Sequence, residues 1–175
     1  DGTVYRFYVQ AETATDKLSA VFGTNEDPLV FSTPGGIFNS PYNPVWSASG
    51  INPSFLAIFP EMADDSYATI GLEGPASLSP GSEDPSLVED PLLSPTISSY
   101  FLNGGNSLNI NTMTGGSWFV LNTAGNALPD ANGQSLVLQI TTTGQVSGSL
   151  NVQIIPEGAG SLEDVQNSFV FDGPG

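Results

Sequence analysis

Glycine and proline interrupt this chain so often that long regular helices have little room between them. The sequence holds 20 Gly and 14 Pro among 175 residues, and they are spread along its whole length. Proline breaks helices and glycine weakens them, and glycine also supplies the positive φ angles that tight turns require. Short apolar runs separated by such residues are typical of many short strands. The sequence therefore predicts an all-β fold.

Three segments alternate between the two faces of a strand with the period of two that half-buried strands show. In residues 4–11, one predicted face carries Tyr5, Phe7, Val9 and Ala11. The runs Gln134–Thr142 and Val146–Ile155 alternate in the same way and flank the turn residues Thr143 and Gly144. This arrangement predicts a β-hairpin.

Shorter strands are predicted at Leu18–Phe22, Leu29–Phe31, Tyr67–Leu72, Ile97–Leu102, Leu108–Ile110, Trp118–Leu121 and Asn167–Phe171. Phe55–Phe59 fits either one helical turn or a short strand. Residues 1–175 are therefore predicted to form a single β-sandwich domain of about nine to eleven short strands, with a jelly roll as one possible arrangement.

Two segments are predicted to be long loops. Residues 33–54 contain four prolines and several aromatic side chains that we expect to pack onto the sandwich. Residues 74–95 hold five prolines and four acidic residues, which predicts an acidic surface excursion. Loops of this length in a compact domain are usually functional or mobile.

The charge balance excludes several classes of function. The chain has 18 Asp and Glu against Arg6 and Lys17 and contains no His, which gives a net charge of -16. Nucleic acids need cationic contacts to their phosphates, so nucleic-acid binding is excluded, and anionic membrane surfaces are disfavoured for the same reason. No apolar run is long enough to span a membrane, so we expect no membrane insertion. Self-repulsion of such a chain is reduced by salt or by bound divalent cations.

The residue inventory also limits the chemistry. Without His or Cys, catalytic triads and most transition-metal sites are excluded. The absence of Cys fits an extracellular protein whose core needs no disulfides. Carboxylate pairs remain, and Asp64 and Asp65 are the candidate pair for glycoside hydrolysis. The alternative is that Asp65 caps backbone N–H groups in a loop before a strand. We do not expect the protein to be an enzyme.

Calcium is the more plausible ion, because it takes oxygen ligands from Asp, Asn and backbone carbonyls. The candidate ligands in predicted loops are Asp27, Asp64, Asp65, Asp130 and Asn132. The alternative is that these residues form ordinary turns, at Asp27-Pro28 and at Asn132-Gly133.

Exposed aromatic side chains on a sandwich can stack against sugars. Tyr42 and Trp46 lie in the proline-rich loop and are the candidate glycan-binding residues, with loop anchoring as the alternative. Trp118 follows Gly115 and Gly116 at the start of a predicted strand, so we expect it in the core.

Several blocks in order resemble a β-domain that is repeated in large secreted and surface proteins of marine bacteria and some algae. They are VYRFYV at 4–9, LSAVFG at 18–23, DSYATIG at 65–71, GGSWF at 115–119, LVLQITTTG at 136–144 and VSGSLNVQ at 146–153. Tyr67 stands where that family usually has Trp, and residues 74–95 have no counterpart in it. The resemblance implies an extracellular module and no catalytic residues.

These observations favour an extracellular structural or assembly module, such as a repeat of a filament, a surface layer or an adhesin. We expect it to associate with itself or with neighbouring repeats by β-strand addition, through an exposed edge or an arm such as residues 1–10 or 74–95. A carbohydrate-binding module that grips polysaccharide through loop aromatics is the first alternative, and a carboxylate-dependent glycoside hydrolase is the second. The ending FDGPG at 171–175 is expected to begin a linker to further chain.

Overall fold

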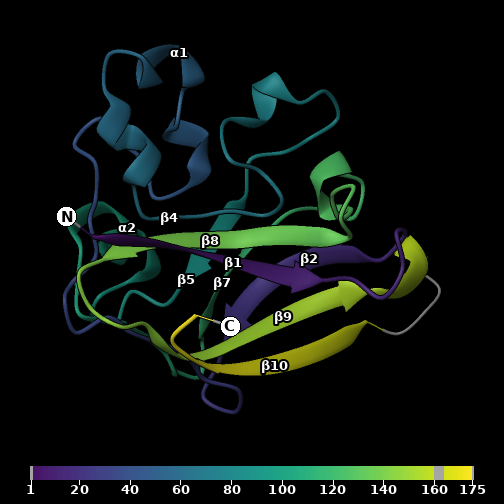
Figure 1. Ribbon diagram of the computed structural model, residues 1–175. Helices are drawn as coiled ribbons and strands as arrows, with labels where there is room; N and C mark the ends of the chain where they lie inside the picture. Colours follow the sequence, from purple (N-terminus) through teal and green to yellow (C-terminus); the bar gives the residue numbers. More distant parts are fainter. Residues whose placement is uncertain (1, 160–163, 175) are drawn as a thin grey trace.

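The computed structural model describes residues 2–159 and 164–174, and they form an all-β sandwich of two antiparallel sheets (Figure 1). The three-stranded sheet has the order β1 (Thr3–Gln10), β8 (Gln134–Thr142) and β4 (Tyr67–Ala68). The seven-stranded sheet contains β5 (Ser86–Glu89), β7 (Gly116–Phe119), β2 (Lys17–Gly23), β9 (Ser147–Ile155), β3 (Leu29–Ser32), β6 (Ser107–Ile110) and β10 (Val165–Asp172). The predicted fold class and the predicted range of strand numbers are confirmed. The predicted hairpin is wrong, because β8 belongs to the smaller sheet and β9 to the larger one, and the two strands do not pair.

In the larger sheet, the long strand β9 pairs with two shorter strands on the same side, β2 and β3. Both β2 and β3 run antiparallel to β9, one after the other. β7 pairs with β2, where Gly23 lies opposite Gly116, and β6 pairs with β3, where Leu29 lies opposite Ile110. β10 pairs along its full length with the other side of β9 and forms one edge of the sheet. β5 pairs with β7 and forms an edge on the far side.

The helices are short. They are α1 (Pro53–Leu56), α2 (Ile97–Asn103) and the 3₁₀ helices η1 (Ala48–Gly50), η2 (Pro60–Asp64), η3 (Ala76–Leu78), η4 (Gly125–Ala127) and η5 (Pro156–Gly158). In Figure 1, α1 and its neighbouring turns lie on the β4 and β8 side of the sandwich, away from β9 and β10. The helical-turn alternative for Phe55–Phe59 agrees with the structure, because α1 includes Phe55 and Leu56 and the Phe59 N–H donates to the Phe55 carbonyl at 2.7 Å.

The predicted strand at Ile97–Leu102 is wrong, because this segment forms α2. The Thr96 side chain caps the helix by accepting from the Ser99 N–H, and Gly104 ends it with a positive φ. The buried side chains are Ile97, Tyr100 and Phe101. Their spacing of three and four residues is the helical period, and it buries one face against the core.

Two other boundaries differ from the prediction. Only Tyr67–Ala68 of the predicted strand at 67–72 forms ladder pairs, although Thr69 and Gly71 still donate backbone hydrogen bonds to carbonyls of β8. Residues 74–95 are also more than a surface excursion. They supply β5 to the larger sheet, and Leu93 is buried in the core.

Trp118 joins the two sheets through the core. It lies in β7 and is fully buried, as predicted. Its Nε1–H donates to the carbonyl of Thr69 at 3.1 Å and to the carbonyl of Val137 in β8 at 3.2 Å. On the facing side, Tyr5, Phe7 and Val9 of β1 point into the same core, which confirms the predicted inward face of that strand.

β8, the central strand of the smaller sheet, is buried on both faces, because the segment at 33–66 covers its outer face. The Phe38 N–H donates to the carbonyl of Thr141 in β8, and the Ser66 N–H donates to the carbonyl of Phe38. The burial pattern of β8 is accordingly continuous, with every residue after Gln134 buried. Polar side chains on the outer face of β8 must therefore find partners inside the protein.

We predict that Gly148→Ala destabilises the sandwich strongly. Gly148 lies in β9 with a φ of 151°, and a Cβ there would come within 1.8 Å of the Val30 carbonyl oxygen. Backbone strain and displacement of β3 together should cost about 3 kcal/mol or more. The matched control is Gly81→Ala, because Gly81 has a φ of 82° and no atom near its Cβ position. This control should cost only about 1 kcal/mol. Urea unfolding measures both, and equal losses would contradict the prediction.

Candidate functional site

The five candidate calcium ligands lie in three separate loops. Asp27 is exposed between β2 and β3, Asp130 and Asn132 form the turn before β8, and Asp64 and Asp65 follow each other at the end of η2. Within residues 2–159 and 164–174, no group of three or more His, Cys, Asp or Glu side chains is arranged to hold a metal ion. A calcium site at these residues stays a prediction.

Asp130 serves its own turn, which is the arrangement that turn chemistry alone predicts. Its Oδ1 accepts from the backbone N–H groups of Asn132 at 2.8 Å and Gln134 at 2.9 Å. The hydrogen bond from Gln134 is the main reason that the pKa of Asp130 lies below its usual value. The side chain thus fixes the entry into β8.

Asp64 and Asp65 face different environments and do not form a matched carboxylate pair. Asp64 is exposed, whereas Asp65 is buried. Oδ1 of Asp65 accepts from the Ser40 N–H at 2.6 Å, and Oδ2 accepts from Nδ2 of Asn43 at 2.7 Å. Asp65 therefore caps a loop, as the alternative to a catalytic role predicted. It ties residues 40–43 to the end of η2.

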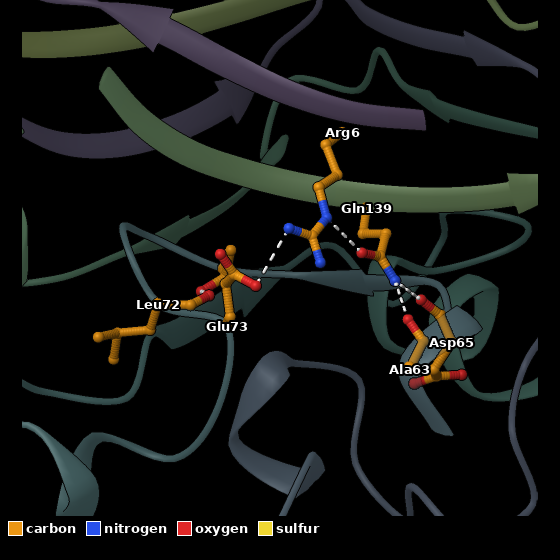
Figure 2. Close-up of polar contacts among 7 residues, drawn as sticks. Arg6, Ala63, Asp65, Leu72, Glu73 and Gln139 are labelled. Atoms are coloured by element: carbon orange, nitrogen blue, oxygen red, sulfur yellow. Dashed lines mark hydrogen bonds and ion pairs between the residues drawn. The ribbon is translucent and has the colours of Figure 1, made fainter. Parts of the chain in front are cut away.

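A polar network on the outer face of β8 was not identified from the sequence (Figure 2). Arg6 donates from Nε to Oε1 of Gln139 at 2.9 Å. The amide of Gln139 in turn donates to the carbonyls of Ala63 at 2.9 Å and Asp65 at 2.7 Å. Arg6 also pairs with Glu73 at 3.1 Å, the only ion pair among the described residues. Because both partners are largely exposed, this ion pair adds little to stability. The network provides hydrogen-bond partners for the buried Gln139 amide. The one sequence feature that points to it is the position of Gln139 on the outward face of an alternating strand.

The two candidate glycan-binding aromatics differ in exposure. Tyr42 is exposed and stacks on Phe59, with ring centroids 3.9 Å apart and planes 20° apart. Trp46 is partly buried and packs against the main core, so the anchoring alternative describes its position. One face of Tyr42 is therefore already covered by another ring.

Three strands of the seven-stranded sheet, β5, β6 and β10, each pair with one neighbour and are edge strands, and β5 and β6 are only four residues long. The edges β5 and β10 differ in how well they are protected. β5 is only four residues long and lies between Pro85 and Pro91. Short strands and flanking prolines are common ways of blocking edge pairing. β10 is eight residues long and contains neither Pro nor Lys. Its residues are exposed or half-buried on both faces, with Val170 88% and Phe169 45% exposed.

A groove lies between β10 and the free edge of β1, because the smaller sheet covers only part of β10. Phe171 is covered, since its ring packs 5.0 Å from the rings of both Phe7 and Phe31. Phe169, two residues earlier on the same face, lines two adjoining pockets of about 300 and 270 Å³ that share this residue and Gln10. An added strand beside β1 or β10 would cover this apolar surface.

The strands β1 and β10 themselves carry little charge. Between them, β1 and β10 contain one basic residue, Arg6, and one acidic residue, Asp172. Among the residues that the structure describes, Glu12 and Asp16 line one of the pockets beside β10, and the remaining acidic residues belong to other loops, to helices and to β5. Repulsion between two copies is therefore low along β10 itself.

Comparisons with known proteins assign no family: no family model matches the chain, and neither a curated protein nor a solved structure matches it. The resemblance to repeated extracellular β-domains stays a prediction. In the part of the chain that the structure describes, no helix has the length and apolarity needed to cross a membrane.

We predict that Asp65 titrates far above an ordinary aspartate. Burial raises the pKa of Asp65 from 3.8 to about 6, although the hydrogen bonds from Ser40 and Asn43 act in the opposite direction. The folded protein thus holds the proton more tightly than the unfolded chain does. The contribution of Asp65 to the free energy of unfolding is therefore greatest below pH 3.8 and is lost as the pH rises through about 6.

The size of this loss is on the order of 3 kcal/mol. Carboxyl ¹³C NMR should give a midpoint near 6 for Asp65, assigned by the signal that disappears in Asp65→Asn. The free energy of unfolding of Asp65→Asn should fall less steeply over the same pH range than that of the wild type. Asp64→Asn, at the exposed neighbour, is the control and should keep the wild-type slope. A midpoint near 4, the usual value for aspartate, would show that the prediction is wrong.

Proposed function

We propose that the protein is an extracellular structural module that assembles with a second copy of itself through the edge strand β10. The observation that carries this proposal is the edge itself, which is eight residues long, contains neither Pro nor Lys, and is exposed or half-buried along its length. Such an edge offers unpaired N–H and C=O groups to an incoming strand. No described strand pairs with the outer side of β10.

The chemistry of β10 favours its own copy as the partner. Antiparallel pairing of two β10 strands about a twofold axis brings Phe169 and Val170 of each copy close to those of the other. Main-chain hydrogen bonds continue the sheet, and Phe169 gains cover within the groove beside β1. Full burial of a Phe or Val side chain contributes about 1.5–3 kcal/mol. A basic partner would instead be attracted to the acidic loops.

Salt is expected to control this assembly. Each copy carries a net charge of -16, so two copies repel each other at long range. Raising the salt concentration from about 0.1 M to about 1 M shortens the screening length from about 10 Å to about 3 Å. The near-neutral β10 edge then associates with little remaining repulsion. Calcium enters the proposal only as a further counter-ion for the acidic surface.

Twofold pairing through β10 closes a dimer and does not by itself extend further. A filament, surface layer or adhesin stalk forms when dimers are also joined by a second contact or by the covalent chain. The arms considered from the sequence are paired within the sandwich, so the proposal does not assign that contact to them. Residues 3–10 are fully paired with β8, and residues 86–89 are paired with β7.

We predict that Val170→Lys abolishes the dimer and leaves the fold intact. Val170 is 88% exposed, so the lysine is tolerated in the monomer but places two like charges together across the interface. The matched control is Val88→Lys on the blocked edge strand β5, where Val88 is 53% exposed. Both variants lower the net negative charge equally, so a difference between them reports the edge and not overall repulsion.

Sedimentation velocity at about 0.1 M and about 1 M NaCl measures the association, with and without calcium. The wild type and Val88→Lys should dimerise more strongly at high salt, whereas Val170→Lys should stay monomeric. Negative-stain electron microscopy of the same samples distinguishes discrete dimers from extended arrays. A wild type that is monomeric at every salt and protein concentration tested, or equal dimerisation of the two lysine variants, would refute the proposal.

A further inference from the structure

A pocket of about 440 Å³ lies away from the β10 edge, where the segment at 35–38 crosses the end of β8. Its walls come from Gly35, Phe38, Asp64 and residues 141–143, among others. This volume lies in the range of small-molecule sites. The pocket mixes apolar and polar groups, as such sites usually do.

Three oxygen-bearing side chains of the pocket have no partner among the residues the structure describes. Asp64 makes neither a hydrogen bond nor an ion pair there, and the exposed hydroxyl of Thr143 makes no hydrogen bond. Thr141 is buried, and its Oγ1 is the one buried side-chain polar atom left without a partner in the described part of the chain. By contrast, Thr142 donates from Oγ1 to the Gly36 carbonyl. Buried polar atoms normally have partners, so the unpaired Thr141 hydroxyl indicates an unfilled bonding requirement.

The aromatic ring of Phe38 forms part of the pocket wall, and hydrogen bonds hold its backbone in place. Phe38 is 38% exposed, and its N–H donates to the Thr141 carbonyl at 2.8 Å. Its own carbonyl accepts from the Ser66 N–H at 3.0 Å. Two backbone hydrogen bonds therefore hold the segment that carries the ring, which lowers the entropy lost when a ligand stacks on it.

Glycine at position 35 allows this wall to approach the threonines. A Cβ on Gly35 would lie 2.7 Å from both the Gly144 backbone nitrogen and Oγ1 of Thr143. Such a contact would force the loop away from β8. The close approach keeps the ring of Phe38 and the hydroxyls of residues 141–143 around one pocket.

The side chains that line the pocket favour one chemical class of ligand. An aromatic face suits the apolar C–H surface of a sugar, while hydroxyl groups and a carboxylate accept or donate the hydrogen bonds of its hydroxyls. Neither of the two basic side chains lines the pocket to bind an acidic sugar. Arg6 is paired with Glu73, Lys17 donates to the Asn122 carbonyl, and the net charge is -16. We infer that this pocket binds a neutral saccharide, a role that is independent of assembly through β10.

The test is a titration of the ¹⁵N-labelled full chain with neutral gluco-, galacto- and manno-oligosaccharides, followed by amide NMR. Shifts should concentrate at Gly35, Gly36, Phe38 and Thr143. Phe38→Ala and Asp64→Ala should each weaken binding about tenfold or more, the loss expected when a ring contact or a hydrogen bond to a charged group is removed. The matched controls are Tyr42→Ala and Asp27→Ala, an exposed aromatic and an exposed acid outside the pocket. Both should bind like the wild type.

Four outcomes would overturn the inference. One is that none of the saccharides shifts the pocket amides. A second is that Phe38→Ala and Asp64→Ala, confirmed as folded by their amide spectra, bind as tightly as the wild type. A third is that Tyr42→Ala alone loses binding, which would place the sugar at that loop. The fourth is that calcium chloride or tetramethylammonium shifts the pocket amides while the sugars do not, which would assign the site to a cation.

Discussion

The buried indole of Trp118 is the interaction on which the sandwich depends. Trp118 belongs to the larger sheet, yet its N–H is satisfied by two carbonyls on the smaller one, at Thr69 and Val137. The ring also packs edge-on against Phe101 of α2, with centroids 6.3 Å apart. One side chain thus fixes the separation of the sheets, the position of the chain that follows β4, and the docking of α2. Its donor would be costly to leave unpaired in the core, so the two sheets are held in one arrangement.

The covering of β8 and the exposure of β10 have opposite consequences. Because both faces of β8 are buried, Gln139 needs internal partners, and the segment at 33–66 supplies them at Ala63 and Asp65 (Figure 2). The same covering segment brings Phe38 and Asp64 to the end of β8, where they line the pocket of about 440 Å³. No equivalent segment in the described residues covers β10. One side of the sandwich is therefore covered by the segment at 33–66, while the other ends at the edge strand β10 (Figure 1).

The charge distribution connects the two proposals. Acidic residues in loops and turns, such as Asp27 and Asp130, keep the surface soluble and repel other copies and anionic ligands alike. The β10 edge and the pocket at residues 141–143 are both poor in charge, with Asp172 and Asp64 as their acidic members. Both places therefore favour contacts with uncharged groups. Main-chain pairing at the edge and hydroxyl recognition in the pocket both meet that condition.

The sequence by itself determined the strands whose pattern is local. The alternation in β1, β8 and β9 predicted the strands, and in β1 it also predicted the side chains that face the core, because a period of two is a property of neighbouring residues. It failed at residues 97–102, where a short apolar run fits a strand or a helix, and the cap at Thr96 decided for the helix.

Tertiary structure alone decided which sites those elements form. Asp64 and Asp65 are adjacent in sequence, yet only Asp65 is buried, because residues 40–43 fold over it from more than twenty positions away. Likewise, an edge strand and a buried strand can share the same residue pattern. Whether β10 has one neighbour or two depends on pairing between distant segments, whose free energy is set by the whole fold and not by any local window.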